Sequence, residues 1–125
     1  MAVYSKILTK TDISTRLEVN ASSLGDFFPP LPAGQYKQVL DVEDENGKNW
    51  KFSLRIRQQG QYEKPCVSQG TWRPFVEEKQ AEVGDKVEFS TGSAGRYKIR
   101  VMKPLDPPVR LFGSTIDYVP RIPNN

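Results

Sequence analysis

The stretch from Gln38 to Arg57 constrains the fold more than any other part of the sequence. In it, two segments of alternating apolar and polar residues flank Asn46-Gly47. In the second segment one face is expected to carry Trp50, Phe52, Leu54 and Ile56, and the opposite face Lys51, Ser53, Arg55 and Arg57. Successive side chains of a strand point to opposite sides, and Asn-Gly favours a tight turn. The stretch therefore predicts a β-hairpin with one buried face.

The rest of the chain also has mostly the pattern of strands. Further short strands are expected at residues 6–9, 16–19, 64–68, 86–90 and 97–101, with a polar loop at residues 10–15. Two short helices are expected, at Asn20–Phe28 and at Trp72–Lys79, the second with Thr71 as its N-cap. This order of about seven strands and two short helices predicts one mainly β domain.

The composition excludes most catalytic and metal-binding chemistry. The 125 residues, with a mass of 14.2 kDa, include no histidine and one cysteine, Cys66. A Cys/His zinc site and an intramolecular disulfide therefore cannot form, and Cys66 is expected to be a small buried hydrophobe. The acids beside the hairpin turn are expected to be solvated turn residues: Asp41, Glu43, Asp44 and Glu45. We predict a protein without catalytic activity, metal or cofactor.

The sequence also gives no sign of a membrane-spanning or secreted segment. No apolar run approaches the ~18–20 residues of a membrane-spanning helix. The first residues, Met1 to Lys6, lack the apolar core of a signal peptide. A single cysteine fits a reducing compartment.

Charge is unevenly distributed along the chain. The net charge is only +3, but residues 48–64 carry five bases and one acid, whereas residues 41–45 carry four acids and no base. If the fold separates these stretches, one face is basic, as in a protein that binds a polyanion such as nucleic acid. An ordinary solvated surface explains the same distribution, so both interpretations stay open here.

Two loops carry side chains suited to nucleic acid. Arginine and glutamine, which read guanine and adenine edges, occur at Arg55, Arg57, Gln58, Gln59 and Gln61. Hydroxyls and cations suited to phosphates or bases occur in the polar loop, at Thr9, Lys10, Thr11, Ser14, Thr15 and Arg16. On residue types alone, both loops are equally well explained as solvated edges of a barrel.

Five segments of the chain form a pattern by their order and spacing. They are Lys6–Asp12 (KILTKTD), Arg16–Val19 (RLEV), Asp44–Phe52 (DENGKNWKF), Trp72–Val76 (WRPFV) and Val83–Phe89 (VGDKVEF). Each segment is weakly specific alone, but the five together cover about residues 4–102. The pattern resembles the plant-specific B3 DNA-binding domain.

The resemblance implies a fold and a way of binding. The fold is expected to be a seven-stranded open barrel with two short helices, and two arms, Lys10–Arg16 and Arg55–Lys64, are expected to grip the major groove of DNA. Base reading is assigned to Arg55, Arg57, Gln58, Gln59 and Gln61. Phosphate binding is assigned to Lys10, Thr11, Ser14, Thr15, Arg16 and Lys64. The implied protein is a plant transcriptional regulator, nuclear and monomeric on double-stranded DNA.

Asp12 has a separate role in this interpretation, because a carboxylate does not attract DNA. It is expected to shape its loop through an Asx turn, in which the side chain bonds to the backbone two residues on.

The last residues, 104–125, are expected to extend a domain formed by residues 1–103. They include five of the ten prolines of the chain. We expect four apolar side chains to pack on the barrel: Leu111, Phe112, Ile116 and Tyr118. Alternatively, the tetrapeptide Arg110-Leu111-Phe112-Gly113 (RLFG) is similar to a short repression motif of some plant transcription factors, RLFGV, which recruits a corepressor. Ser114 stands here where that motif has valine.

Two further functions stay open on the sequence. A protein-interaction module of the same fold would lack specific DNA binding and act through the tail. A binder of single-stranded nucleic acid would need exposed aromatic side chains that stack on bases, and only Tyr62 fits that role on the basic surface.

Overall fold

The structure, a computed structural model, contains eight strands and two helices in the part of the chain that it describes. It describes residues 3–19, 27–28, 37–59, 62–92 and 96–120, apart from the side chains of residues 56–64, 106 and 111. The strands are β1 (Val3–Ile7), β2 (Leu17–Glu18), β3 (Lys37–Glu43), β4 (Asn49–Gln59), β5 (Tyr62–Val67), β6 (Lys86–Thr91), β7 (Tyr97–Leu111) and β8 (Ser114–Pro120). The helices are α1 (Lys10–Ser14) and α2 (Gln69–Lys79).

The hairpin expected around Asn46-Gly47 forms from β3 and β4. The two strands pair antiparallel from Lys37 opposite Arg55 to Glu43 opposite Asn49. Gly47 has φ +83°, a left-handed conformation that glycine adopts without steric cost. The strongest turn signal of the sequence is therefore confirmed.

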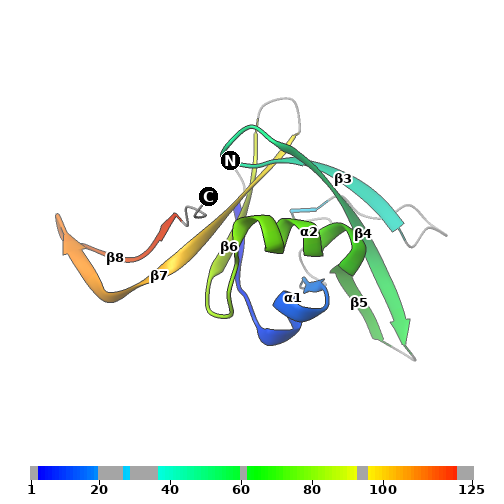
Figure 1. Cartoon of the computed structure of the whole chain (residues 1–125), viewed down its shortest axis with the longest axis horizontal. Helices are drawn as coiled ribbons and strands as arrows, with labels where there is room; N and C mark the ends of the chain where they lie inside the picture. Colours follow the sequence, from blue (N-terminus) through cyan, green and yellow to red (C-terminus); the bar gives the residue numbers. More distant parts are fainter. Residues whose placement is uncertain (1–2, 20–26, 29–36, 60–61, 93–95, 121–125) are drawn as a thin grey trace.

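The strands form one curled sheet. Its order is β1-β6-β7-β3-β4-β5-β2, and β8 is added to β7 outside this path. In Figure 1 the seven strands of the path curl around α2 as an open half-barrel. The expected mainly β, seven-stranded open barrel with two short helices is confirmed, and β8 is an addition to it.

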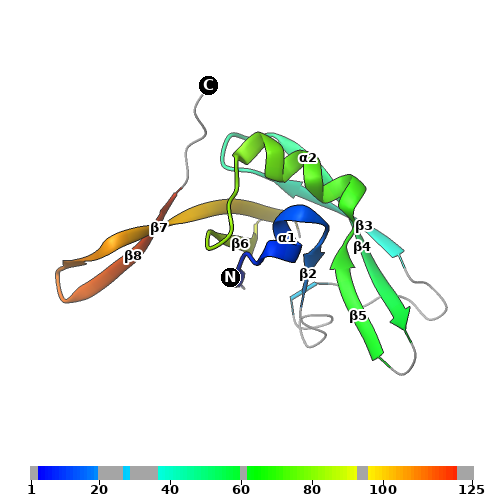
Figure 2. The same cartoon turned by 60° about the horizontal axis from the view of Figure 1, so that its bottom comes forward.

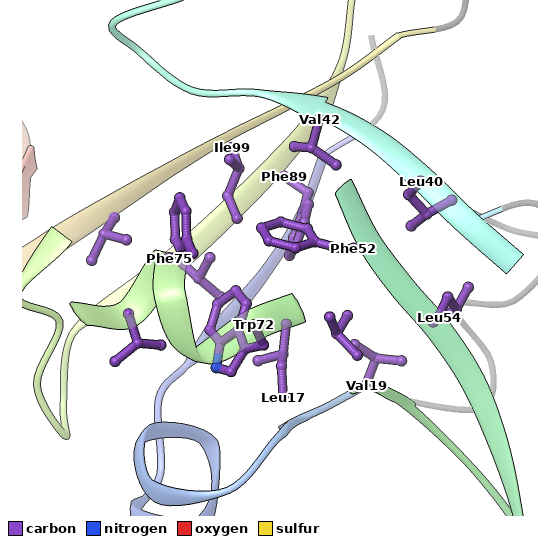
Figure 3. Packing of buried hydrophobic residues seen from close by; sticks show 14 of the residues in the cluster. Leu17, Val19, Leu40, Val42, Phe52, Leu54, Trp72, Phe75, Phe89 and Ile99 are labelled. Atoms are coloured by element: carbon purple, nitrogen blue, oxygen red, sulfur yellow. The ribbon is translucent and has the colours of Figure 1, made fainter. Parts of the chain in front are cut away.

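The half-barrel closes over a core rich in aromatic rings. Phe52 and Leu54 of β4 are fully buried, as are Trp72 and Phe75 of α2. The Phe52 ring lies 5.6 Å from the centres of both the Trp72 and Phe75 rings, at steep angles that suit edge-to-face contact (Figure 3). Cys66 on β5 is buried as expected. Burial of each large apolar side chain stabilises the fold by about 1.5–3 kcal/mol.

The start of α2 differs from the expectation. Ser68, not Thr71, is the N-cap, and Thr71 lies in the first turn. The Thr71 hydroxyl accepts a hydrogen bond of 3.0 Å from the backbone N–H of Ser53 on β4. Because β5 ends at Val67, opposite Leu54, this hydroxyl takes the place of a strand partner for Ser53.

One of the two helices is the one that the sequence predicts, because α2 contains the expected helix Trp72–Lys79. The other, α1, was not predicted. The prediction of a polar loop at residues 10–15 is wrong, because α1 occupies Lys10–Ser14. Most of the expected helix Asn20–Phe28 lies outside the described residues, and its last two residues form a turn and a β-bridge. Among the described residues, no helix is long and apolar enough to span a membrane.

The β3–β4 turn is joined to the end of α2 by buried charges. Asp44 was expected to be solvated, but it is 4% exposed, because Trp50 Nε1 and Lys79 Nζ donate to its Oδ2 at 3.0 and 2.9 Å. Burial alone would raise the pKa of Asp44. The hydrogen bonds from Trp50, Lys79 and the backbone N–H groups of Lys48 and Asn46 outweigh it and lower that pKa to about 2.

The C-terminal part forms a β-hairpin that projects from the half-barrel (Figures 1 and 2). Phe112 and Gly113 turn the chain with φ values of 52° and 78°, as in a type I′ turn. Tyr118 contacts the body: its hydroxyl lies 3.4 Å from the carbonyl oxygen of Gly84, and Lys86 Nζ lies 4.5 Å from its ring centre. The expected packing of Phe112 on the barrel is wrong, because this side chain is 98% exposed. Strand β7 runs through residues 103 and 104 without a break. The division into a domain of residues 1–103 and an extension of residues 104–125 stays a prediction.

Candidate nucleic-acid interface

A capping box starts α1. The hydroxyl of Thr9 accepts the backbone N–H of Asp12 at 3.3 Å, and the Asp12 carboxylate accepts the backbone N–H of Thr9 at 2.8 Å. This reciprocal pair satisfies two N–H groups that the first turn would otherwise leave without partners. The box explains why residues 10–14 form a helix. Its signature, Thr-x-x-Asp, is visible in the sequence.

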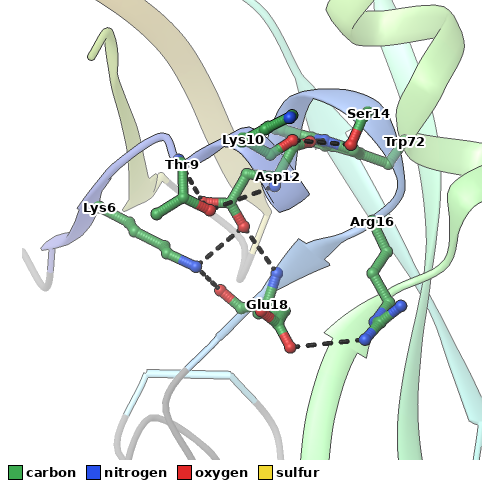
Figure 4. Close-up of polar contacts among 8 residues, drawn as sticks. All are labelled: Lys6, Thr9, Lys10, Asp12, Ser14, Arg16, Glu18 and Trp72. Atoms are coloured by element: carbon green, nitrogen blue, oxygen red, sulfur yellow. Dashed lines mark hydrogen bonds and ion pairs between the residues drawn. The ribbon is translucent and has the colours of Figure 1, made fainter. Parts of the chain in front are cut away.

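The second oxygen of Asp12 ties α1 to the strands on either side of it. Asp12 Oδ1 accepts Lys6 Nζ at 2.9 Å and the backbone N–H of Glu18 at 3.1 Å (Figure 4). The expected Asx turn is therefore wrong: the carboxylate bonds three residues back and six residues on. With Asp12 fully buried, β1, α1 and β2 are fixed around one side chain.

Helix α1 is also fixed to the core. The indole N–H of Trp72, on α2, donates a hydrogen bond of 2.7 Å to the carbonyl oxygen of Asp12. Trp72 is 1% exposed and belongs to the central cluster. Side chains on the outer surface of α1 are therefore carried by a rigid support.

That surface presents several of the predicted phosphate-binding residues. Lys10 and Ser14 are exposed, whereas Thr11, Thr15 and Arg16 are partly buried. The Ser14 hydroxyl donates to the carbonyl oxygen of Lys10 at 2.8 Å. An Arg16 nitrogen lies 3.6 Å from the carboxylate of Glu18. Among the described residues Lys10 has no ion pair, so its charge is available to a ligand.

The β4–β5 hairpin carries the other predicted residues. Arg55 is exposed on β4. The strand register places Arg57 opposite Lys64, Gln58 opposite Glu63 and Gln59 opposite Tyr62. The side chains of these six lie outside the described part of the structure, as does the whole of Gln61, so their roles in base reading and phosphate binding stay predictions.

The sheet adds a cation that sequence reasoning missed. Lys37, the first residue of β3, lies directly opposite Arg55, and both side chains are exposed. The sequence did not indicate this pair, because a two-residue turn at Asn46-Gly47 would place Lys37 opposite Ile56, one position away from the observed register. Lys37 also lies outside the basic stretch 48–64.

Helix α1 and the β4–β5 hairpin, which carry the predicted phosphate-binding and base-reading residues, lie on the same half of the molecule. In Figure 1 helix α1 lies below α2 near the lower centre and the end of the β4–β5 hairpin lies at the lower right, whereas the β7–β8 hairpin projects to the left. Figure 2 shows α1 facing the viewer, with the end of the β4–β5 hairpin below it on the right. The fold thus brings together two segments that are about 40 residues apart in the sequence.

The RLFG segment lies away from this region, at the tip of the β7–β8 hairpin. Arg110 and Gly113 are exposed, and Phe112 is 98% exposed at positive φ. The side chain of Leu111 lies outside the described part of the structure.

Known proteins share this sequence pattern. B3 domain-containing transcription factor NGA4 of Arabidopsis thaliana is 35% identical over 92 residues, which are 72% of this chain and 26% of that protein. Auxin response factor 3 of the same species is 32% identical over 105 residues, 81% of this chain and 17% of that protein. The chain thus spans about a quarter or less of the length of these relatives.

Solved structures share the fold. The Arabidopsis FUS3–DNA complex matches with a TM-score of 0.70 at 19% identity, over 78% of this chain and 93% of that chain. The complex of the Arabidopsis thaliana transcription factor LEC2 with DNA matches with a TM-score of 0.69 at 17% identity, over 80% and 94%. A family model described as the B3 DNA binding domain matches residues 20–104, which is more than half of the sequence. The chain therefore belongs to the B3 DNA-binding domain family.

Proposed function

We propose that this domain binds double-stranded DNA sequence-specifically in the major groove, through two arms. The first arm is residues 10–16, which include α1, and the second is residues 55–64 at the end of the β4–β5 hairpin. Membership of the B3 family supports the proposal. The observation that carries it is that both arms present cations on one half of the molecule, with Lys10 and Arg55 exposed and without ion pairs among the described residues.

The chemistry of the two arms suggests different tasks. Arginine and glutamine form bidentate hydrogen bonds to guanine and adenine in the major groove. We assign base reading to the second arm: Arg55, Arg57, Gln58, Gln59 and Gln61. Hydroxyls and ammonium groups bind phosphates and set the register. We assign phosphate binding to Lys10, Thr11, Ser14, Thr15, Arg16 and Lys64.

The experiment that tests this function is selection of bound duplexes from a randomised pool. The affinity of the domain for the selected duplex and for a scrambled duplex is then measured across a salt series. Recovery of a short motif, bound about 10³-fold or more tightly than the scrambled duplex, supports the proposal. Equal binding of both duplexes with a steep salt dependence would leave only a generic basic patch.

The relatives suggest the wider role. Because several are transcription factors of plants, we propose that the chain is the DNA-binding part of a nuclear plant transcriptional regulator. We propose further that it binds DNA as a monomer and without a cofactor. This role is one of binding rather than catalysis.

A second candidate function is recruitment of a corepressor by the RLFG segment. The observation that favours it is the 98% exposure of Phe112 at the tip of the projecting hairpin. The test fuses the chain to a heterologous DNA-binding domain and measures repression of a reporter gene in plant cells. Phe112→Ala is expected to abolish repression, whereas Val83→Ala, which shortens another exposed apolar residue, is expected to leave it unchanged. Equal repression by both variants would contradict the assignment.

A further inference from the structure

An unbalanced pair of cations lies on the outer face of β3 and β4. The register places Lys37 directly opposite Arg55, and both side chains are exposed. Opposite side chains of an antiparallel pair have Cβ atoms only about 4.5–5.5 Å apart, so like charges there repel each other. Among the described residues, neither Lys37 nor Arg55 forms an ion pair.

The same two strands carry a balanced pair nearer the turn. Four residues along β3, Asp41 lies opposite Lys51, and their charged groups are 2.8 Å apart. On the outer face of the hairpin, the charge of Lys51 is therefore balanced by Asp41, whereas the charges of Lys37 and Arg55 are not balanced among the described residues. The end that carries Lys37 and Arg55 continues into β5, where the register places Lys64 opposite Arg57.

We propose that Lys37 binds a backbone phosphate of the same DNA duplex that the two arms grip. The proposal rests on the proposed function, because the phosphate belongs to that duplex. Repulsion between Lys37 and Arg55 destabilises the folded protein when no ligand is bound. An anion that binds between or beside these two side chains removes the repulsion. An ammonium group is a compact point charge that suits a phosphate, so Lys37 adds affinity but reads no base. The DNA-binding surface then extends over β3, β4 and β5.

Two single substitutions on β3 and β4 test the proposal, since each removes one positive charge from the same face. Lys37→Ala is the test, and Lys51→Ala is the matched control, because Lys51 is already paired with Asp41. The affinity of each variant for the selected duplex is measured between 50 and 200 mM salt. Loss of one phosphate contact makes the slope of log K against log salt shallower by about 0.9, which is about three- to four-fold over this range. Lys37→Ala is expected to show this change and Lys51→Ala the wild-type slope.

The outcomes separate this inference from the proposed function. If the wild-type domain selects a duplex and Lys37→Ala has the slope of Lys51→Ala, the assignment of Lys37 is wrong and DNA binding stands. If the wild-type domain binds no duplex in preference to others, both the proposed function and the assignment of Lys37 are wrong. Thermal unfolding without DNA is a second check: Lys37→Ala is expected to keep or raise the midpoint at low salt. A lowered midpoint would show a structural role and contradict the argument from repulsion.

Discussion

The carboxylate of Asp12 accepts hydrogen bonds from the side chains of Lys6 and Thr9 and from the backbone N–H groups of Thr9 and Glu18. All these distances lie between 2.8 and 3.1 Å, and the acceptor is fully buried. The placement of α1, and with it the first arm, depends on this single residue.

Asp12→Asn tests that dependence. An amide removes the negative charge and points an NH2 group at N–H or ammonium donors, so buried donors lose their acceptor. We expect the free energy of unfolding to fall by about 1–3 kcal/mol, measured by urea denaturation. The control is Asp41→Asn, in which an exposed carboxylate paired with Lys51 is changed in the same way. Equal stability of the two variants would show that Asp12 is not a structural centre.

Single residues also show where sequence reasoning stopped. The buried positions Phe52, Trp72 and Phe75 follow from strand alternation and helical spacing, so they could be predicted. Asp12 was not assigned to DNA binding, and its hydrogen-bond partners were not foreseen. Lys6 and Glu18 lie six residues from it on two different strands, and no local pattern specifies that they meet.

At the scale of elements, the link between the β3–β4 turn and α2 is formed by charged groups, so its stability is expected to depend on pH. Lys79, at the end of α2, is 1% exposed and lies 2.9 Å from both Asp44 and Glu45. Burial alone would lower the pKa of Lys79, but the hydrogen bonds to Glu45 and Asp44 raise it. The turn and the helix are therefore held together while the acids are ionised.

The stability of this link is expected to depend on pH in a defined window. The pKa of Asp44 falls from 3.8 to about 2 on folding, so its contribution is fully present above pH 3.8 and is lost as the pH falls through about 2. The shift corresponds to about 2 kcal/mol. Urea denaturation between pH 7 and pH 2 is expected to show the stability advantage of the wild type over Asp44→Asn narrowing by about that amount. Asp41 is present in both proteins, so its titration cancels. A difference that stays constant with pH would contradict the assignment.

The elements also differ in how well the sequence specifies them. The β3–β4 hairpin was predictable because Asn-Gly is typical of its turn. The β7–β8 hairpin was not, because its turn is formed by Phe112-Gly113 and phenylalanine rarely adopts positive φ. Several prolines in β7 also argue against a strand. Pro107 and Pro108 lie where the pairing of β7 with β8 shifts, between Pro104 and Val109.

At the scale of the whole molecule, the two arms are expected to affect DNA binding in different ways. Arg57→Ala, in the second arm, is expected to cost about 1–3 kcal/mol on the selected duplex and to relax specificity at one base pair. Lys10→Ala, in the first arm, is expected to weaken all duplexes alike and to make the salt slope shallower by about one unit. Binding assays with duplexes changed at single positions measure both effects. Unchanged base preference in Arg57→Ala would remove it from the base-reading residues.

The candidate interface as a whole was predictable by residue type but not by arrangement. Arginine, glutamine and hydroxyl side chains in two loops indicated the chemistry, and the family pattern indicated that the loops act together. The charge balance of the surface depends on register, which pairs Lys51 with an acid and leaves Lys37 facing Arg55. Long-range pairing of this kind is decided by the whole sheet, so counting charges along the chain does not reveal it.

The sheet order also determines when each strand can first pair with its partner during synthesis. Val3 of β1 pairs with Ser90 of β6, about 87 positions later in the chain. During synthesis at ~5–20 residues per second, the first strand waits roughly 4–17 s before its partner exists. Non-local pairings of this kind slow the closure of a fold. Strand β1 therefore cannot join the sheet until most of the chain has been synthesised, although it is the first of the described strands to be made.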